Sequence, residues 1–355
     1  MTALRETLVE LVDTPSVTGN EGRICTAIAE RLMATWELDG VVRVGNSLVV
    51  GRRTGRPLVT LYGHIDTVPE QGNGAARIGG DRMHGLGTTD MKGGVAVMIH
   101  LLEDPAVLAG PYDVVGVFYD KEEGPAHENG LEQVLERVPW LEEAALAVIL
   151  EPTDLALELG CNGAMNADVV FRGVAAHSAR PWLGENAVTK AGAWLAALHQ
   201  REPEVVTVGG LEFREVFSVT TASGGIANNV IPSEFTVNLN YRFPPVYGLD
   251  EAEQRLRQVA EAADEITVTD RAAAGTVAAG VAIVDLLGET LHAPVAAKQG
   301  WTDVARLTAR GVPAVNYGPG DAALAHRADE SVSLANVDVA FDRLRTFLSG
   351  AAATD

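Results

Sequence analysis

Hydrophobic and polar residues repeat along the first part of the chain with two different periods. Residues 4–13 and 20–35 place apolar side chains three or four positions apart, which predicts amphipathic helices. Further along, β-rich or apolar runs predict strands over 41–50, 57–63, 113–119 and 145–151, with helices over 93–103 and 128–138. Because strands and helices alternate, we expect an α/β layer structure around a largely parallel sheet.

The pattern changes near residue 163. The expected elements are then strand 165–172, helix 185–199, strands 205–221 and 234–243, helix 250–263 and strand 265–270. This β-α-β-β-α-β order is typical of the ferredoxin-like α+β unit. After a linker-like stretch at 272–282, the alternation returns with helices over 283–292, 301–310 and 335–349 and strands over 294–298 and 313–317. We therefore predict a first domain, residues 1–162 plus 281–355, interrupted by an inserted domain, residues 163–280.

Composition agrees with a globular protein and gives no sign of a membrane span. The 355 residues are 47% hydrophobic and 21% charged, and no apolar run reaches the ~18 residues of a spanning helix. Near the N-terminus, Glu6, Glu10 and Asp13 interrupt the stretch where a signal peptide would be continuously apolar. We therefore expect a cytoplasmic protein.

The charge balance and the cysteines exclude some kinds of partner and site. Lys and Arg total 27 against 48 Asp and Glu, a net charge of −21, which argues against a nucleic-acid or membrane partner. An anionic small substrate is still compatible, because bound metal ions can dominate the local field. Cys25 and Cys161 form no CxxC pair, so we expect two buried thiols and neither a disulfide framework nor a thiolate zinc site.

Five strand or loop ends carry side chains that can bind a metal. "LYGHIDTVP" ends a strand with His64 and Asp66, and "GLGTTDMKGG" puts Asp90 before a helix. The other three ends are "VFYDKEEGP" (117–125), "VILEPTD" (148–154) and "GPGDAALAHRADE" (318–330). Each has an ordinary explanation alone, such as a helix N-cap for Asp90 or a solvated loop for the glutamates. In an α/β sheet, however, such ends can converge on one edge.

These side chains offer only nitrogen and oxygen ligands. Zinc accepts histidine and carboxylate, and paired-metal hydrolases hold two ions ~3.5–4 Å apart with a bridging group. Two histidines and three carboxylates suit such a pair: one histidine and one terminal carboxylate per ion, with one aspartate shared. A further carboxylate is then available as a general base.

The ordered set H-x-D, G-x-x-D-M-K-G-G, E-E-G, E-P-T and a late histidine resembles the di-zinc amidohydrolase and exopeptidase family. This family includes acetylornithine deacetylase, carboxypeptidase G and succinyl-diaminopimelate desuccinylase, and the resemblance spans nearly the whole chain. It implies an exopeptidase-like catalytic domain with a ferredoxin-like lid and dimerisation domain. It also implies two Zn²⁺ ions, which Co²⁺ or Mn²⁺ can replace.

The resemblance assigns a role to each residue of the set. His64, Asp90 and Glu151 would hold one zinc ion, and Asp90, Glu123 and His326 the other. Asp66 would orient His64, Glu122 would be the general base, and the peptide bond after Asp90 would be cis. We expect Gly124-Pro125 to end the strand and let the backbone turn between the two glutamates, with Asp120 at the surface or in a supporting position.

The inserted domain contributes further candidates. From sequence alone His177 fits a solvent-facing loop, but the resemblance implies that it reaches the active site of the partner subunit in a homodimer and stabilises the oxyanion. The substrate carboxylate would be bound by Asn228, Asn229 and Arg242, with Arg180 and Thr302 as further candidates. Arg306 falls one residue late for the G-x-[ST]-D-x-R run of desuccinylases.

The stretches "HSARPWLGENA", "NNVIP", "LNYRF" and "GWTDVARL" are most similar to those of actinobacterial-type succinyl-diaminopimelate desuccinylases. This resemblance implies hydrolysis of N-succinyl-LL-2,6-diaminopimelate, a step of lysine biosynthesis. Two alternatives stay open: another N-acyl amino acid hydrolase of the family, such as acetylornithine deacetylase or a metallocarboxypeptidase, and a metal-binding homologue without catalysis.

Overall fold

The computed structural model describes residues 2–351, which form two compact units. The first unit contains residues up to 159 together with 278–296 and 306 onward, and the second contains 160–277 and 297–305. Residues 297–305, which the sequence placed in the first domain, belong to the second unit. There Lys298 accepts a backbone hydrogen bond from Asn162, and the Gln299 side chain accepts one from Arg214.

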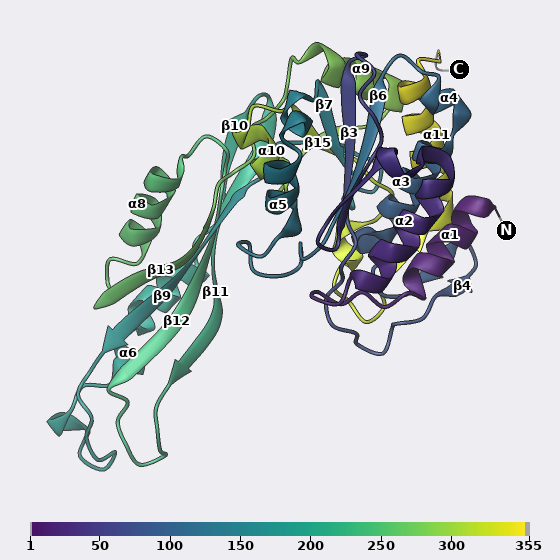
Figure 1. The fold of residues 1–355 in the computed structure, drawn as a ribbon. Coiled ribbons are helices and arrows are strands. Elements are labelled where there is room, and N and C mark those ends of the chain that lie inside the picture. The colour runs from purple at the N-terminus through teal and green to yellow at the C-terminus, as the bar shows by residue number, and fades with distance from the viewer. Residues whose placement is uncertain (1, 352–355) are drawn as a thin grey trace. The chain divides into compact units, whose positions relative to one another are not determined.

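The first unit is built on an eight-stranded sheet (Figure 1). Its strands, in spatial order, are β1 (Val41–Val44), β2 (Ser47–Val50), β6 (Asp113–Tyr119), β3 (Leu58–His64), β7 (Leu146–Ile149), β15 (Ala314–Asn316), β8 (Leu157–Leu159) and β14 (Val295–Ala297). The four central strands, β6 to β15, pair in parallel, whereas β2 and β8 add to them antiparallel. The expected parallel sheet is therefore present at the centre. Every residue of β3 and β6 is buried, as in sheets covered on both faces.

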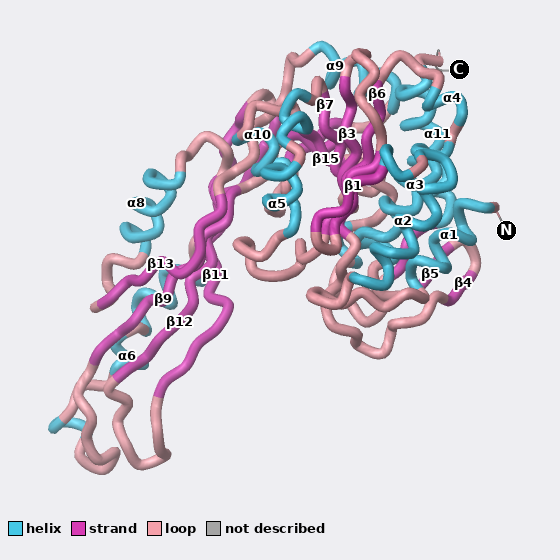
Figure 2. The backbone as a smooth tube through the Cα atoms, viewed as in Figure 1, coloured by secondary structure: helices cyan, strands magenta, loops and turns pink. Residues whose placement is uncertain are grey.

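Helices cover the two faces of this sheet. Figures 1 and 2 show α1 (Ala3–Val12), α2 (Gly22–Trp36), α3 (Gly93–Glu103) and α11 (Leu334–Ser349) gathered on one side, and α5 (Gly130–Arg137) on the other. The remaining helices of this unit are α4 (Pro105–Leu108), α9 (Ala282–Leu291) and α10 (Val304–Ala309), whose first two residues belong to the second unit. A Cβ at Gly94 would lie 2.3 Å from the carbonyl oxygen of Leu150, so glycine lets α3 pack directly against the end of β7.

The register of the central strands decides where their ends lie. Leu58 lies opposite Asp113 and His64 opposite Tyr119, while Tyr62 lies opposite Ile149. The carboxyl ends of β3, β6 and β7 therefore meet at one edge of the sheet. This is the edge at which α/β proteins place their ligands.

Asp113 lies at the other end of β6. Its buried carboxylate accepts hydrogen bonds from the backbone N–H groups of Thr54 (2.6 Å) and Gly55 (3.0 Å) and from the Arg56 guanidinium. Burial raises the pKa of Asp113, but the Thr54 hydroxyl, which donates to it at 2.6 Å, and these donors outweigh burial and lower the pKa to about 2. The ionised carboxylate thus fixes the turn that precedes β3.

The second unit is a five-stranded antiparallel sheet with helices. It contains β9 (Gly163–Arg172), α6 (Ala187–Lys190), α7 (Gly192–His199), β10 (Glu204–Val208), β11 (Leu211–Gly224), β12 (Glu234–Phe243), α8 (Leu249–Val259) and β13 (Glu265–Ala272). The sheet order β10-β11-β12-β9-β13 contains the ferredoxin-like order, with β10 as an extra edge strand. The predicted strand 205–221 is instead a hairpin, because Gly209 and Gly210 adopt φ of 60° and 83° and reverse the chain.

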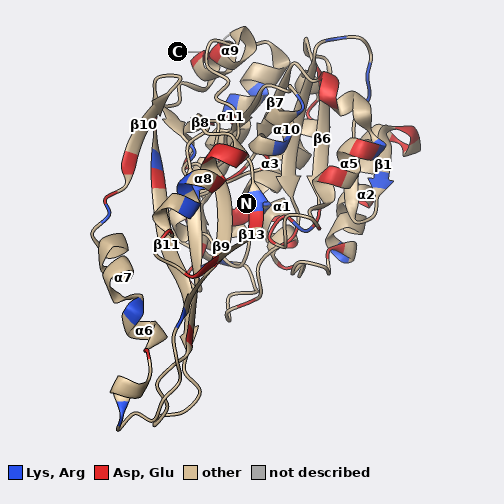
Figure 3. Cartoon of the chain, turned by 90° about the vertical axis from the view of Figure 1, so that its left-hand side faces the viewer, with Lys and Arg blue, Asp and Glu red and all other residues tan. Residues whose placement is uncertain are grey.

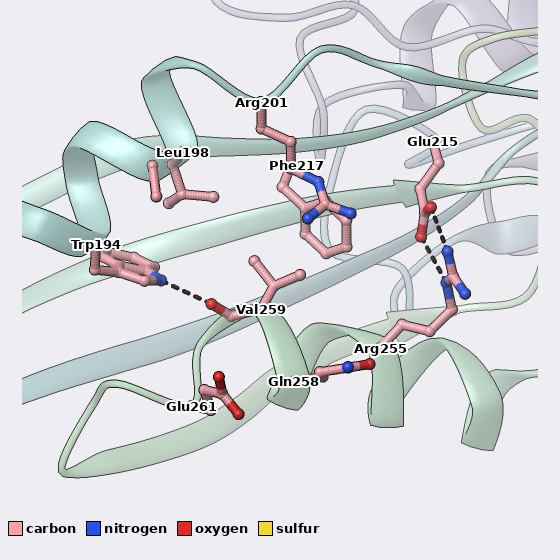
Figure 4. Close-up of a pocket in the computed structure, with 10 residues that line it drawn as sticks. Trp194, Leu198, Arg201, Glu215, Phe217, Arg255, Gln258, Val259 and Glu261 are labelled. Carbon is pink, nitrogen blue, oxygen red and sulfur yellow. Dashed lines mark hydrogen bonds and ion pairs between the residues drawn. The ribbon is translucent and has the colours of Figure 1, made fainter.

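A partly buried ion pair ties α8 to the sheet of the second unit. The Glu215 carboxylate accepts two hydrogen bonds from the Arg255 guanidinium, at 2.8 and 2.6 Å, and the Trp194 indole donates to the carbonyl of Val259 (Figure 4). These residues line a pocket of about 570 Å³ between α7, α8 and the sheet. Its lining contains none of the predicted site residues, so we assign it no catalytic role.

A small third sheet was not predicted. It consists of β4 (Arg77–Gly79), β5 (Arg82–His84) and β16 (Ser331–Ser333), in the order β16-β5-β4. Strands of three residues are too short to show a period of two. The sheet anchors the chain directly after the loop that carries His326.

Candidate metal centre

All five predicted ligands lie together in the first unit. His64, Asp90 and Glu151 form one group of side chains that could hold a metal ion, and Asp90, Glu123 and His326 form another. Within each group, one ligand atom per residue lies within 4.8 Å of the others. Their convergence follows from the register, because His64, Glu123 and Glu151 end or follow the adjacent strands β3, β6 and β7.

Asp90 belongs to both groups through different oxygen atoms. Its Oδ1 lies 3.1 Å from Nε2 of His64, and its Oδ2 lies 3.3 Å from Nε2 of His326. The same His326 nitrogen lies 3.0 Å from the Glu123 carboxylate. A carboxylate with one oxygen toward each histidine is suited to bridge two cations. The peptide bond between Asp90 and Met91 is cis, which confirms that expectation.

The Asp66 carboxylate mainly holds the turn of the adjacent glutamates. It accepts hydrogen bonds from the backbone N–H of Glu122 (3.0 Å) and of Glu123 (3.1 Å), and from the Thr18 hydroxyl (2.9 Å). Nδ1 of His64 lies 3.1 Å from the backbone carbonyl oxygen of Asp66 and 3.4 Å from its carboxylate. Asp66 therefore contacts His64 as expected, and it also fixes Glu122 and Glu123, a function that the sequence did not suggest.

The end of strand β6 differs from the expectation, whereas the turn at the glutamates agrees with it. Strand β6 already ends at Tyr119, so Gly124-Pro125 does not end it, and Lys121 adopts a φ of +60°. The turn that follows is formed by Glu122 and Glu123. Asp120 is buried, so it takes the supporting position that was one of its two expected places and not the surface position. Its carboxylate accepts a hydrogen bond from the Ser47 hydroxyl at 2.6 Å, which ties the turn to β2.

Carboxylates dominate the electrostatics of the site. Burial lowers the pKa of His64, but Asp66 and Asp90 outweigh it and raise the pKa well above its usual value, with a further contribution from Glu122. Hydrogen bonds with Asp90 and Glu123 raise the pKa of His326 to about 10. Burial raises the pKa of Asp90, but the two histidines lower it overall. Such a concentration of ionised oxygen ligands around two imidazoles attracts cations.

The two groups differ in their access to solvent. The side chain of His64 is 1% exposed, whereas that of His326 is 52% exposed. The donor set, two imidazoles and three carboxylates with no sulfur, fits zinc or a similar divalent transition metal.

The predicted substrate-binding residues lie in the second unit. His177, Arg180, Asn228 and Asn229 are exposed, Arg242 is half-buried and Thr302 is buried. His177 pairs with Val230 in an isolated bridge, and the N–H of Ser178 donates to the carbonyl of Asn229. The structure thus brings the His177 and Asn229 segments together, while their roles stay predictions.

The Arg306 side chain makes structural contacts within the first unit. Its guanidinium donates to the carbonyl of Ala126 at 2.7 Å and to the Glu132 carboxylate at 3.2 Å. It therefore braces the loop that follows the glutamate pair, and its late place in the desuccinylase-like run agrees with this position.

Comparison with known proteins identifies the family. Residues 60–349 match the model of the Peptidase family M20/M25/M40. The chain belongs to this family. It is accordingly a hydrolase that acts on amides, and metal dependence is a property of the family.

Two relatives match along almost their whole length. A Mycobacterium tuberculosis (strain ATCC 25618 / H37Rv) protein, provisionally named succinyl-diaminopimelate desuccinylase DapE, is 40% identical, covering 97% of this chain and 98% of the relative. The succinyl-diaminopimelate desuccinylase of Corynebacterium glutamicum is 36% identical, covering 96% of this chain and 94% of the relative.

Solved structures agree with the fold. Aminopeptidase PepT from Bacillus cereus superposes with a TM-score of 0.78 at 18% identity, covering 98% of this chain and 97% of that one. The YXEP protein of Bacillus subtilis, described as a dinuclear metal-binding peptidase from the M20 family, has a TM-score of 0.68 at 16% identity, covering 98% and 96% of the two chains. Within residues 2–351, none of the helices of this M20 protein has the length and apolarity needed to cross a membrane.

Proposed function

We propose that this M20 protein hydrolyses N-succinyl-LL-2,6-diaminopimelate to succinate and LL-2,6-diaminopimelate, a step of lysine biosynthesis through diaminopimelate. The observation that carries the proposal is the similarity, over nearly the full length, to two relatives that both bear this name. The ligand geometry supports the hydrolytic part of it, because Asp90 faces both histidines through separate oxygens.

We further propose that the centre holds two zinc ions, with Co²⁺ or Mn²⁺ able to replace them. His64, Asp90 and Glu151 would bind one ion, and Asp90, Glu123 and His326 the other. When bound, the ions supply Lewis acidity, which polarises an amide carbonyl and makes water more acidic.

Glu122 is the general base of this proposal. Its backbone N–H is fixed by Asp66, and its negative charge contributes to the raised pKa of His64, so its carboxylate lies near the ligand groups. Glu122 would take the proton of the attacking water and deliver it to the departing amine nitrogen as the amide C–N bond breaks. His177 would donate a hydrogen bond to the oxyanion, and Arg242, Asn228, Asn229, Arg180 and Thr302 would bind the substrate.

Features of the second unit support a homodimer. From Val216 onward β11 pairs with β12 on one side, and within the described residues no strand pairs with its other side. Helix α7 contains no Lys, Arg, Asp or Glu and is entirely tan in Figure 3, and Gly192, Ala193 and Ala196 on it are exposed. An open strand edge beside an uncharged helix surface favours a second copy of the same surface.

Subunit mixing tests whether His177 acts in the partner's active site. We expect Glu122→Gln and His177→Ala homodimers each to be nearly inactive. An equal mixture in which the two variants have exchanged subunits should recover about a quarter of wild-type turnover. Only the mixed dimer joins an intact Glu122 to an intact His177 of the partner subunit. No recovery from a mixture that forms heterodimers by mass spectrometry would show that His177 acts within its own subunit or not at all.

A substrate panel tests the proposed reaction. We expect purified protein loaded with Zn²⁺ to release succinate from N-succinyl-LL-2,6-diaminopimelate with a kcat/KM at least ~10²-fold higher than for N-acetylornithine. Activity should disappear with a chelator and return with Zn²⁺ or Co²⁺. A preference for acetylornithine would assign another acyl specificity to the same centre, and no hydrolysis of either amide in the metal-loaded protein would contradict the proposal.

A further inference from the structure

Glu330 is a buried carboxylate beside the ligand groups to which the mechanism gives no role. It is 1% exposed. One of its oxygens accepts hydrogen bonds from the backbone N–H of Thr89 (2.9 Å) and of Asp90 (3.2 Å), and the other accepts from the N–H of Gly87 (3.0 Å). An ionised carboxylate is an acceptor only, which suits it to three converging donors. Glu330 therefore holds the backbone segment from which Asp90 projects.

The same residue belongs to the chain segment that carries His326. The N–H of Glu330 donates to the carbonyl of Arg327 at 3.1 Å, and the carbonyl of Glu330 accepts from the N–H of Gly85 at 3.2 Å. Next to it, the Thr89 hydroxyl contacts the carbonyl of Ser331 at 3.2 Å and the N–H of Asp321 at 3.2 Å. Hydrogen bonds of Glu330 and of the Thr89 hydroxyl thus join the Asp90 segment to the His326 segment.

The other ligands are placed by different elements. His64 is the last residue of β3, Glu151 follows β7, and Glu123 lies in the turn that Asp66 holds. Strand pairing fixes His64 independently of Glu330, and Glu151 follows the paired strand β7. The Asp90–Glu123–His326 group has two ligands, Asp90 and His326, on segments that contact Glu330, whereas the other group has only Asp90. A change at Glu330 should therefore act more strongly on the Asp90–Glu123–His326 group.

We propose that Glu330 is a positioning residue that sets Asp90 against His326 and thereby determines the affinity of the Asp90–Glu123–His326 group for its metal ion. The inference rests on the proposed two-metal centre. Groups that orient metal ligands through hydrogen bonds commonly change metal affinity about 10- to 100-fold when they are replaced. A carboxylate that served only to fold the loop would leave that affinity unchanged in the folded protein.

Replacement of Glu330 by glutamine tests the proposal. Glutamine has the same shape, but its amide NH₂ would face a backbone N–H where the carboxylate accepts a hydrogen bond. In calorimetric titrations of the apoprotein with Zn²⁺, we expect one of the two ions to bind about 10- to 100-fold more weakly to Glu330→Gln and the other to keep an affinity within about threefold of wild type. The visible absorption of the Co²⁺-loaded variant should change in the bands of the weakened ion.

Asp113→Asn is the matched control. Asp113 is also a buried carboxylate that accepts backbone N–H groups, but it lies at the far end of β6. We expect this variant to unfold at lower temperature with both metal affinities unchanged. If the two variants lost affinity in proportion to their lost stability, the effect of Glu330 would be general destabilisation and the proposal would be wrong.

A second variant keeps the proposal testable if Glu330→Gln folds poorly. Thr89→Val removes the neighbouring hydroxyl contacts at nearly constant volume and should weaken the same ion by a smaller factor. Unchanged affinity and unchanged Co²⁺ absorption in the folded variants would overturn the inference while leaving the two-metal centre intact. Wild-type protein that binds fewer than two ions would instead contradict the proposed function.

Discussion

Replacement of Glu122 by glutamine should lower kcat about 10³-fold or more while two metal ions stay bound. Glutamine fills the same volume, and the backbone N–H of residue 122 can still donate to Asp66, so the turn should persist. The amide, however, cannot take a proton from the attacking water or return it to the amine, and positioned general bases contribute about 10²- to 10⁴-fold. Steady-state kinetics together with metal analysis of the dialysed variant provide the measurement.

Glu128 provides a control in the same loop. It is half-exposed and its carboxylate lies 3.8 Å from Nζ of Lys121, so Glu128→Gln should keep kcat within about twofold of wild type. Near-normal turnover in Glu122→Gln would assign the base to another residue. Loss of one metal ion from that variant would make Glu122 a ligand, and the roles of the two adjacent glutamates would have to be exchanged.

Replacement of Asp90 by asparagine should weaken both metal ions and abolish turnover. Asp90 is the only predicted ligand in both groups, with one oxygen toward His64 and the other toward His326. Asparagine keeps one oxygen, replaces the other by an NH₂ donor and removes the negative charge. We expect the metal content after dialysis to fall well below that of wild type at both positions, with affinity losses of about 10²-fold or more.

Glu151→Gln is the comparison for this prediction. Glu151 belongs to one group only, so its loss should affect mainly the ion shared with His64. Both variants can be titrated with Zn²⁺ and assayed at each metal ratio. Asp90→Asn protein that retains two tightly bound ions would show that Asp90 does not bridge them.

Local sequence patterns were sufficient to predict where the ligand groups come together. His64 and Glu151 end or follow apolar runs, and parallel pairing of those runs places their ends at one edge whatever the details of the loops. Asp90 could be included because its DMKGG motif resembles that of the family, and in the structure the second glycine of this motif packs against the end of β7. Each of these patterns involves residues that are close in the sequence, and the strand order of the sheet brings the ligands at their ends close together in space.

Features that depend on long-range contacts could not be predicted. Nothing around Lys121 indicates a positive φ, since that conformation is fixed by Asp66 and Ser47, which are far away in the sequence. Glu330 looks like a surface residue in "HRADE", and its three N–H donors come from residues 87–90. The hairpin at Gly209-Gly210 could have been predicted from the sequence, because a glycine pair is a recognisable turn signal. The apolar residues on both sides of the pair instead led to the prediction of one continuous strand.

The order of the ligands along the chain has a consequence for biosynthesis. His64, Asp90, Glu123 and Glu151 all precede the second unit in the sequence, whereas His326 follows it. A nascent polypeptide that has emerged as far as the second unit therefore contains all three ligands of the His64 group, but it lacks both the histidine of the other group and Glu330, which holds the Asp90 segment. The complete centre can form only after translation has passed the second unit, so maturation of the enzyme must be a late event in its synthesis.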